Sequence, residues 1–256
     1  MSEFVSFHDL KGASVFITGG GAGIGAALTE GFIEQGAKVA FVQRSDATGF
    51  VNEMQQKHGV APLFIQCDIS DVAALQAALE QAASAHGDIS VLVNNAANDA
   101  RHSLQEYTPQ DWDNAMAVNL RPHFFSAQAV APGMKALGGG SIINLSSISY
   151  MMGNAGYPGY VASKAAITGL TRGLARELGP DGIRVNTLLP GWVLTQKQLD
   201  MWATPDGLAA HLERQCLKEH LVPQDIVDAT LFLASRASRM MTSQAMVVDG
   251  GVVVTG

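Results

Sequence analysis

The chain has 256 residues, of which 47% are hydrophobic and 15% charged, and its formal net charge is -7. This composition is typical of a compact globular protein and argues against disorder. The negative charge comes without a basic run, so it gives no support to a nucleic-acid or anionic-membrane partner and favours small-molecule chemistry.

The N-terminal stretch, MSEFVSFHDLKGASV, is acidic and polar, unlike the basic and then apolar start of a secretory leader. No apolar run farther along is long enough to span a bilayer. Cys67 and Cys216 form no CxxC pair and no cluster with histidine, which predicts neither a disulfide framework nor a metal site. We therefore expect a cytoplasmic protein with no membrane or nucleic-acid partner.

Short apolar runs alternate along the chain with Ala- and Leu-rich segments of helical periodicity. Strands alternating with helices indicate a parallel sheet covered on both faces, because such strands read as continuous apolar runs. No linker, low-complexity tract or repeat divides the chain. The sequence predicts one α/β domain over residues 1–256, doubly wound and Rossmann-like, with seven strands: Ser14–Thr18, Lys38–Val42, Pro62–Cys67, Ser90–Asn94, Ser141–Leu145, Ile183–Leu189 and Ala245–Asp249.

The first expected strand runs into the glycine-rich TGGGAGIG, residues 18–25, and then into a helical segment. Gly19, Gly23 and Gly25 permit a tight turn, so that the free N–H groups and dipole of the helix can face a pyrophosphate. A flexible loop is the alternative, and Ile24 stands where the common GxGxxG spacing has its last glycine. The position between strand and helix favours a dinucleotide.

The second expected strand ends in Gln43, Arg44 and Ser45, where an NAD site would normally have an acidic residue for the ribose hydroxyls. A guanidinium beside a hydroxyl suits a 2′-phosphate, which favours NADP over NAD, although a solvent-exposed arginine is the simpler explanation. Asp68 could accept a hydrogen bond from the adenine amino group. It could also cap the next helix, a role open to Ser70 or Asp71.

The segment YVASK places Tyr160 and Lys164 four residues apart on one face of a long helical stretch that ends at Gly179-Pro180. A neighbouring ammonium favours the phenolate, so Lys164 is expected to lower the pKa of Tyr160 toward the working range. Ser147 follows the fifth strand, where its hydroxyl could hold the reacting oxygen or simply shape a turn. Asn119, disfavoured inside a helix, could link Lys164 to solvent through water or mark a helix irregularity.

Residues 191–222, between the sixth strand and the next helix, form a connection longer than this architecture normally has. Their length suggests a lid over a site at the carboxyl edge of the sheet.

These motifs occur in the order and spacing of short-chain dehydrogenases/reductases, which the whole chain resembles. The resemblance implies an NAD(P)-dependent oxidoreductase, usually a homotetramer, with Asn119, Ser147, Tyr160 and Lys164 at the catalytic positions. Ala97 departs from the more frequent glycine. The implied cofactor contacts, in addition to the glycines, Arg44 and Ser45, are Ile24, Asp68, Ile69, Asn95, Ala96, Tyr160, Lys164, Pro190, Gly191, Val193 and Thr195.

Stretches such as NDARH, VNLRPH and PGWVLT are more narrowly similar to bacterial aldose 1-dehydrogenases, which oxidise the anomeric hydroxyl of a sugar to the lactone. A sugar needs several hydrogen-bonding partners. Two alternatives stay open: a reductase of a ketone or 3-oxoacyl substrate, and a non-catalytic NAD(P)-binding sensor. In the reductase the lid would be apolar, lined by Trp192, Trp202, Leu199, Met201 and Leu208. Candidate sugar contacts are Asn98, Arg101, His102, Ser147, Asn154, Tyr160, Trp192 and Gln198.

Overall fold

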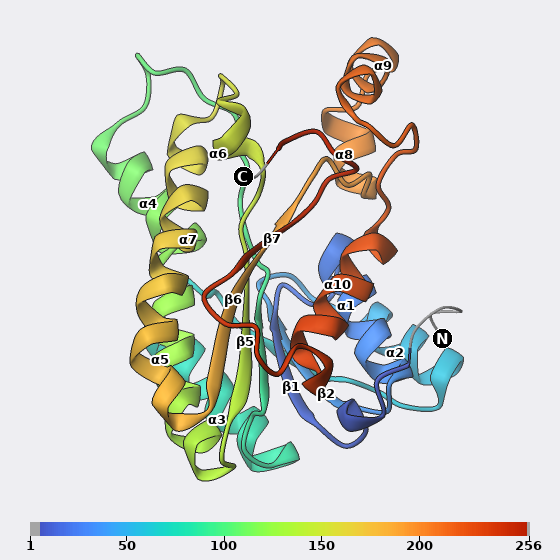
Figure 1. Cartoon of the computed structure of the whole chain (residues 1–256), viewed down its shortest axis with the longest axis vertical. Helices are drawn as coiled ribbons and strands as arrows, with labels where there is room; N and C mark the ends of the chain where they lie inside the picture. The colour runs from blue at the N-terminus through green and yellow to red at the C-terminus, as the bar shows by residue number, and fades with distance from the viewer. Residues whose placement is uncertain (1–5, 255–256) are drawn as a thin grey trace.

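The computed structural model describes residues 6–254, so the first five and last two residues of the expected 1–256 domain lie outside the described part (Figure 1). Seven parallel strands form one sheet in the order β3-β2-β1-β4-β5-β6-β7 within these residues. The order reverses between β1 and β4, which is where ligands of doubly wound folds bind. The strands are β1 (Ser14–Thr18), β2 (Lys38–Gln43), β3 (Leu63–Gln66), β4 (Val91–Asn94), β5 (Gly140–Leu145), β6 (Ile183–Pro190) and β7 (Ala245–Val248).

All seven strands expected from the sequence are present, and each observed end lies within one residue of the expected one. All residues of β1 and β4 are buried, as are all but the first of β5, because helices cover both faces of the sheet. The predicted single α/β domain with a seven-stranded parallel sheet is confirmed.

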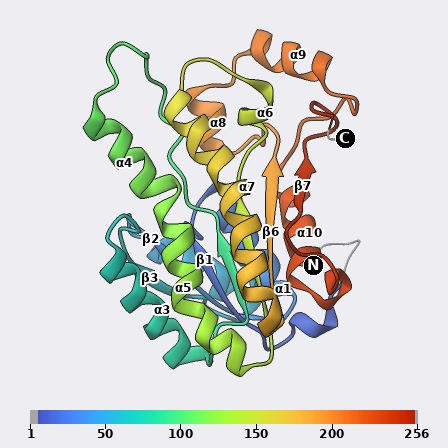
Figure 2. The same ribbon diagram turned by 60° about the vertical axis from the view of Figure 1, so that its left-hand side comes forward.

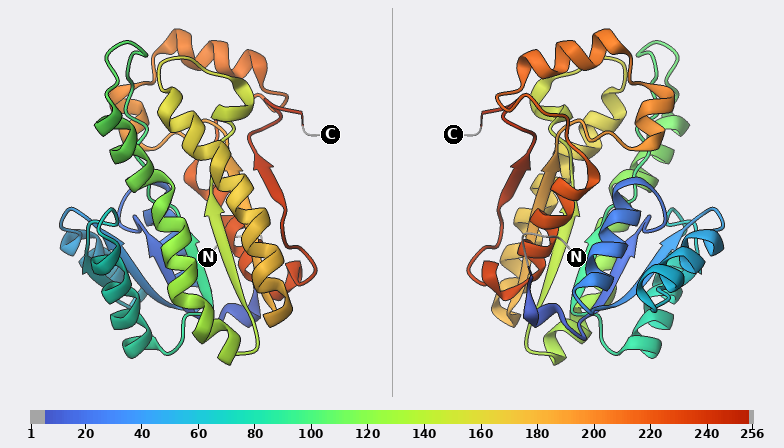
Figure 3. Two further views of the ribbon diagram at one scale, coloured as in Figure 1. Left: turned by 90° about the vertical axis from the view of Figure 1, so that its left-hand side faces the viewer. Right: turned by 90° about the vertical axis from the view of Figure 1, so that its right-hand side faces the viewer.

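Helices pack on both faces of the sheet, as the two opposite views in Figure 3 show. One group of buried residues lies beneath α1 (Gly23–Glu34), α2 (Thr48–His58) and α10 (Pro223–Ala234). A second group lies beneath α3 (Val72–His86), α5 (Arg121–Ala136) and α7 (Pro158–Leu178). The remaining elements are α4 (Pro109–Asn119), α6 (Ser149–Met152) and the 3₁₀ turns His8–Leu10, Gly179–Asp181 and Arg236–Ser238.

Residues 191–222 contain two short helices, which lie beyond the carboxyl ends of the strands (Figure 2). These are α8 (Gln196–Met201) and α9 (Pro205–Arg214). Each has a threonine N-cap, Thr195 or Thr204, whose hydroxyl accepts a hydrogen bond from the backbone N–H of the third residue of the helix. A bridge between Val193 and Leu221 joins the two ends of the segment, so it leaves the sheet and returns at one place.

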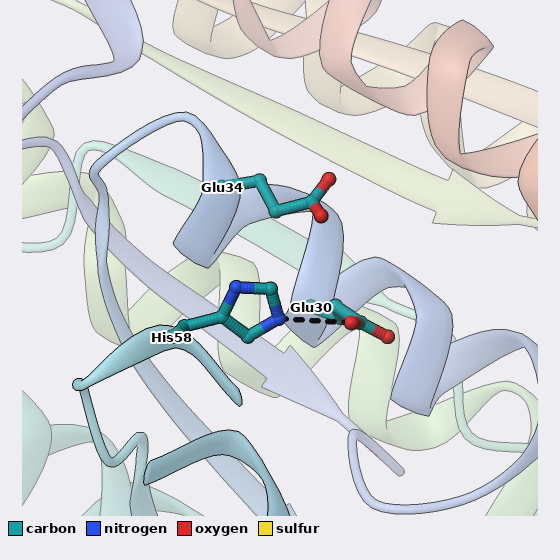
Figure 4. A group of neighbouring side chains, drawn as sticks. All are labelled: Glu30, Glu34 and His58. Carbon is teal, nitrogen blue, oxygen red and sulfur yellow. Dashed lines mark hydrogen bonds and ion pairs between the residues drawn. The ribbon is translucent and has the colours of Figure 1, made fainter. Parts of the chain in front are cut away.

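A polar cluster joins α2 to α1, as Figure 4 shows. His58 Nε2 lies 2.8 Å from Glu30 Oε1, and Lys57 forms an ion pair with the same carboxylate. Glu34 lies near enough for these groups to share a cation within residues 6–254. Burial alone would raise the pKa of Glu30, but Lys57 and His58 hold it below its ordinary value. The carboxylate therefore already has a cationic partner, and the cluster serves to hold the two helices together.

Within residues 6–254, no helix has both the length and the apolar character needed to cross a bilayer.

Candidate active site

A cavity of about 590 Å³ lies at the carboxyl ends of β4, β5 and β6, between the sheet and the 191–222 segment. The floor of the cavity includes Ser147, Tyr160 and Lys164. This is the edge where the switch in strand order opens a crevice between neighbouring connections. The lining contributed by the 191–222 segment comprises Gly191, Trp192, Val193, Thr195, Gln198, Trp202, Gly207, Ala210, His211 and Arg214.

The three expected proton-transfer residues meet at this floor. Tyr160 and Lys164 lie one turn apart on α7, and the Lys164 ammonium is 5.5 Å from the centre of the Tyr160 ring. Lys164 Nζ donates to the Leu145 carbonyl oxygen at 2.8 Å, which fixes the ammonium behind the ring. Ser147 Oγ accepts from the Ser149 backbone N–H at 3.1 Å and also makes a hydrogen bond with Tyr160. The constellation has the geometry of a hydroxyl-binding and proton-accepting site.

Burial dominates the pKa values of Tyr160 and Lys164. It raises the pKa of Tyr160 well above its ordinary value, with the charge of Asp99 acting in the same direction and the Ser147 hydrogen bond acting against it. It also lowers the pKa of Lys164 to about 7. We expected the neighbouring Lys164 to lower the pKa of Tyr160. The pKa of Tyr160 is instead raised, because loss of hydration is the larger effect.

Asn119 is the last residue of α4, and the helix breaks at Leu120 before α5 begins at Arg121. Its buried side chain makes two hydrogen bonds to the backbone of Asn98: Nδ2 donates to the carbonyl at 3.0 Å, and Oδ1 accepts from the N–H at 2.7 Å. The expected helix irregularity is thus present. In this position Asn119 holds the connection that follows β4 beside the cavity.

The glycine-rich turn fits the backbone of a dinucleotide. A Cβ at Gly25 would collide with the carbonyl oxygen of Gly19, and Gly19 itself has a φ of +70°. The N-terminus of α1 has no side-chain cap and no acidic residue in its first turn, so its N–H groups and dipole remain available for an anion. Asn95 fixes the turn from the side, because its Nδ2 donates to the carbonyl oxygens of Thr18 and Gly19.

The expected adenosine side lies at the end of β2. Arg44 and Ser45 are exposed there, and the Arg44 carbonyl accepts from Gln66 Nε2 at 2.8 Å. Asp68 accepts from the N–H and the hydroxyl of Ser70, and these bonds lower the pKa of Asp68, with the charge of Arg44 adding to the effect. Asp71 caps α3, so the helix-cap role does not fall to Asp68. The neighbouring Ile69 is buried.

Several of the other expected cofactor positions surround the cavity. The loop after β4 contributes Asn95, and the adjoining Ala96 donates its N–H to the Thr18 hydroxyl at 3.1 Å. Thr195 stands over the glycine-rich turn, where its methyl group is the nearest neighbour of a Cβ built on Gly23. The remaining expected positions that line the cavity are Ile24, Pro190, Gly191 and Val193.

The expected sugar contacts divide into two groups. Arg101, Asn154, Trp192 and Gln198 line the cavity, together with Ser147 and Tyr160. Asn98 and His102 are not among the lining residues.

The two residues outside the lining shape their own loop. The Asn98 side chain accepts from the Ala100 N–H at 3.2 Å. His102 stacks on Tyr107 with the ring centres 3.6 Å apart, and its Nε2 accepts from the Gly159 N–H at 3.3 Å. His102 thereby supports the loop against the start of α7.

Residues not expected from the sequence complete the wall. Asp99 enters it beside Arg101, whose guanidinium lies 3.7 Å from the Tyr157 ring centre and 5.0 Å from that of Trp202. His211 and Arg214 enter from α9. The i, i+3 spacing of His211 and Arg214 is a sequence signal that could have been found only once a helix was expected in the 191–222 segment.

Comparisons with known proteins agree with this geometry. A family model described as "Enoyl-(Acyl carrier protein) reductase" matches residues 19–253. The chain is 49% identical over 248 residues to the "Probable galactose dehydrogenase GalD" of Rhizobium meliloti, covering 96% of this chain and 97% of that protein. It is 44% identical over 246 residues to the D-xylose 1-dehydrogenase of Caulobacter vibrioides, with the same coverage of 96% and 97%.

A solved structure is similar as well. The blue fluorescent protein from a metagenomic library, in complex with NADPH, superposes with a TM-score of 0.86 at 37% identity and covers 96% of this chain and 99% of its own.

Proposed function

The chain belongs to the short-chain dehydrogenase/reductase family, and from this premise we propose that it oxidises the anomeric hydroxyl of an aldose to the lactone with NAD(P) as cofactor. The observation that carries the proposal is that Tyr160, Lys164 and Ser147 meet at the floor of a cavity whose upper wall includes hydrogen-bonding side chains from the 191–222 segment. The names of the two relatives, a galactose and a xylose dehydrogenase, support an aldose as substrate class.

The lining of the 191–222 segment favours a sugar over an apolar ketone. Of the residues that would line an apolar pocket, Leu199, Met201 and Leu208 are outside the cavity lining, and the first two are about half exposed. Trp192 and Trp202 do line the cavity. Trp202 Nε1 and His211 Nε2 belong to lining residues and are buried without a hydrogen-bond partner among the described residues. Asn154, Gln198 and Arg214 also line the cavity, and their amide and guanidinium groups can form hydrogen bonds with a polyhydroxylated ligand but not with an apolar one.

Proton transfer is assigned to the residues on the cavity floor. Ser147 holds the substrate hydroxyl, and Tyr160 Oη takes its proton. Lys164 stabilises the phenolate form that Tyr160 must have before it can accept this proton, because its ammonium lies 5.5 Å from the centre of the Tyr160 ring and is held by the Leu145 carbonyl. Asn119 fixes the loop that carries Asn98 and Asp99. The nicotinamide, when bound, supplies the hydride acceptor.

For the cofactor we propose NADP rather than NAD. The glycine-rich turn and the uncapped start of α1 suit the pyrophosphate, which both cofactors share. Arg44 and Ser45, exposed at the end of β2, offer a guanidinium and a hydroxyl to a 2′-phosphate. We further propose that the 191–222 segment is a lid, that its Thr195 contacts the cofactor, and that the protein is a homotetramer.

The test of the proposed function is the absorbance of reduced nicotinamide with purified protein and NAD or NADP, across pentoses, hexoses, 6-deoxyhexoses, secondary alcohols and, in reverse, ketones. Aldose-dependent reduction with lactone as product is expected. Activity only with alcohols or ketones would assign the same residues to a carbonyl reductase. No turnover on any substrate, with cofactor binding intact, would assign the chain to the non-catalytic sensors.

Arg44→Leu tests the cofactor proposal. Because a charge-assisted contact to the phosphate would be lost, we expect the KM for NADP to rise about tenfold or more while the KM for NAD stays within about twofold. Arg172→Leu, which makes the same substitution at an exposed arginine of α7, is the matched control. An equal change for both cofactors in Arg44→Leu would contradict a 2′-phosphate contact.

A further inference from the structure

Asp99 is the single acidic side chain among the described lining residues of the cavity. It lies on the connection after β4, and only 19% of its side chain is exposed. The charge of Asp99 raises the pKa of Tyr160, so the carboxylate is close enough to act on the proton-transfer site. A carboxylate in this position is costly unless it has a function or a full set of partners.

Two lid residues hold this carboxylate. Lys197 Nζ donates to Oδ1 at 2.7 Å, and Gln198 Nε2 donates to Oδ2 at 3.1 Å. Burial alone would raise the pKa of Asp99, but the hydrogen bonds and charge of Lys197, with the hydrogen bond of Gln198, outweigh burial and keep the pKa below its ordinary value. Asp99 is therefore ionised at neutral pH and can only accept hydrogen bonds.

Asp99 and Gln198 each have one hydrogen-bonding site that no described residue uses. A carboxylate offers about four acceptor sites, and Asp99 uses three of them, for Lys197, Gln198 and its own N–H. Gln198 accepts at Oε1 from Trp192 Nε1 at 2.9 Å and uses one of its two Nε2 hydrogens on Asp99. One acceptor site on Asp99 and one donor hydrogen on Gln198 thus remain side by side in the lining of the cavity.

We propose that Asp99 is a specificity-determining residue that accepts a hydrogen bond from a ring hydroxyl of the sugar, while Gln198 donates to the oxygen of the same hydroxyl. A hydroxyl both donates and accepts, which is the complement of this pair. Lys197 is a positioning residue, since it holds the carboxylate from the lid side. This inference rests on the proposed function, because it supplies the contact that an aldose has and a simple secondary alcohol lacks.

The pair explains how the site would reject apolar substrates. A ligand without a hydroxyl at this place would cover the ionised Asp99 and the Gln198 donor without replacing their hydration. Sites built around hydrogen-bonding groups discriminate strongly against analogues that lack the matching group, since their polar atoms are then left unpaired.

The experiment compares wild type and Asp99→Asn on an aldose that wild type oxidises, on each monodeoxy analogue of that aldose, and on a simple secondary alcohol. We expect kcat/KM for the aldose to fall about 10- to 100-fold, mainly through KM, because a charge-assisted hydrogen bond is weakened. The rate with the simple alcohol should change by less than about threefold. The deoxy analogue that lacks the contacted hydroxyl should be insensitive to the substitution.

Asp200→Asn is the matched control, because it makes the same substitution in an exposed residue of α8, the helix that contains Lys197 and Gln198. Lys197→Met tests the positioning role: KM for the aldose should rise while kcat stays within about threefold, and Lys197→Arg should restore KM. Binding of NADPH, followed by its fluorescence, shows whether the Asp99 variant is folded. If Asp99→Asn does not fold, the monodeoxy series on Gln198→Leu gives the same comparison through the donor half of the pair.

Equal losses on aldose, every deoxy analogue and simple alcohol would overturn the inference and leave the proposed function standing. So would an unchanged kcat/KM for the aldose. A wild-type protein that oxidises no aldose would overturn both.

Discussion

At the scale of single residues, the site depends on charges placed where water cannot reach them. Lys164 is 1% exposed, and its ammonium has one hydrogen-bond acceptor, the Leu145 carbonyl, among the described residues. Burial lowers the pKa of Lys164 to about 7 and raises that of Tyr160. Both effects oppose formation of a phenolate beside an ammonium, and the Ser147 hydrogen bond acts against them by lowering the pKa of Tyr160.

Tyr160→Phe should abolish most turnover and leave cofactor binding intact. The substitution removes the one group that takes the substrate proton and keeps the ring that packs against Lys164. General acid and base groups contribute on the order of 10² to 10⁴ in rate, so kcat should fall at least about 100-fold. The dissociation constant for NADPH, measured by fluorescence, should stay within about twofold.

Tyr150→Phe is the control for this variant, since Tyr150 lies in α6, ten residues before Tyr160, and is absent from the cavity lining. Near-normal turnover in Tyr160→Phe would remove Tyr160 from the mechanism.

His123 is a second buried basic group near the site, and it should make folding sensitive to acid. Burial, with a smaller effect from the charge of Lys164, lowers the pKa of His123 to about 3. An unfolded histidine has a pKa near 6.5. Between about pH 6.5 and 3 the unfolded chain therefore binds a proton that the folded chain does not, and the free energy of unfolding falls by up to about 1.4 kcal/mol per pH unit as pH drops.

Urea unfolding of His123→Leu and wild type at pH 7, 6 and 5 tests this expectation. Other groups titrate in the same window, so the informative quantity is the difference between the two proteins in the slope of the free energy of unfolding against pH. This difference should approach the slope for one bound proton, about 1.4 kcal/mol per pH unit. His8→Leu, which removes an exposed imidazole, is the comparison variant. Parallel slopes for wild type and His123→Leu would show that His123 is protonated in the folded protein.

At the scale of elements, packing between helices depends on positions where there is no room for a side chain. Gly31 is buried in α1, and a Cβ at this position would meet Val227 of α10. Gly31→Ala should lower the free energy of unfolding by about 1 to 3 kcal/mol, because the close contact between the two helices would have to open.

Gly49→Ala is the matched substitution in α2, where a Cβ would have no neighbour within 4 Å. Gly49→Ala should raise the free energy of unfolding by about 0.5 to 1 kcal/mol, since glycine in a helix loses more conformational entropy on folding than alanine does. Thermal or urea unfolding of both variants measures the contrast, and equal effects would mean that helix propensity alone decides both positions.

Elements with regular periodicity could be predicted from the sequence, and those determined by the tertiary structure could not. The seven strands could be placed because buried parallel strands read as apolar runs. The residues proposed to be catalytic could be placed because Tyr160 and Lys164 share a helix face, and because strand ends meet at one edge.

The lid and the substrate wall were less predictable. Helix α8 has six residues, too few for a distinct helical period, whereas the ten residues of α9 have such a period but follow Trp202 and Pro205 in a stretch expected only to be a long connection. Asp99 lies in a loop, where spacing carries no information about direction, and its partners Lys197 and Gln198 are about 100 residues away. His102 directly follows Arg101, yet it packs on Tyr107 instead of entering the wall. The side-chain directions of loop residues follow from such distant contacts.

At the scale of the whole molecule, the two faces of the sheet differ in what they leave exposed. Helices α4 and α5 follow each other in one column along one side (Figure 2). Trp112 on α4 and Phe124 on α5 are 45% and 43% exposed. Large aromatic side chains on a protein surface are typical of interfaces, where each contributes strongly when it is buried.

We expect this column to form part of the interface of the proposed homotetramer. Sedimentation of wild type should show a species about four times the 26.9 kDa mass of the chain. Phe124→Glu should shift the distribution toward smaller species, because a charge would be buried without a partner. Val60→Glu, at a site 48% exposed between α2 and β3, is the control and should leave the assembly unchanged.

A tetramer unaffected by Phe124→Glu would place the interface elsewhere. A monomeric wild type that oxidises sugar at full rate would show that the site is complete within one chain.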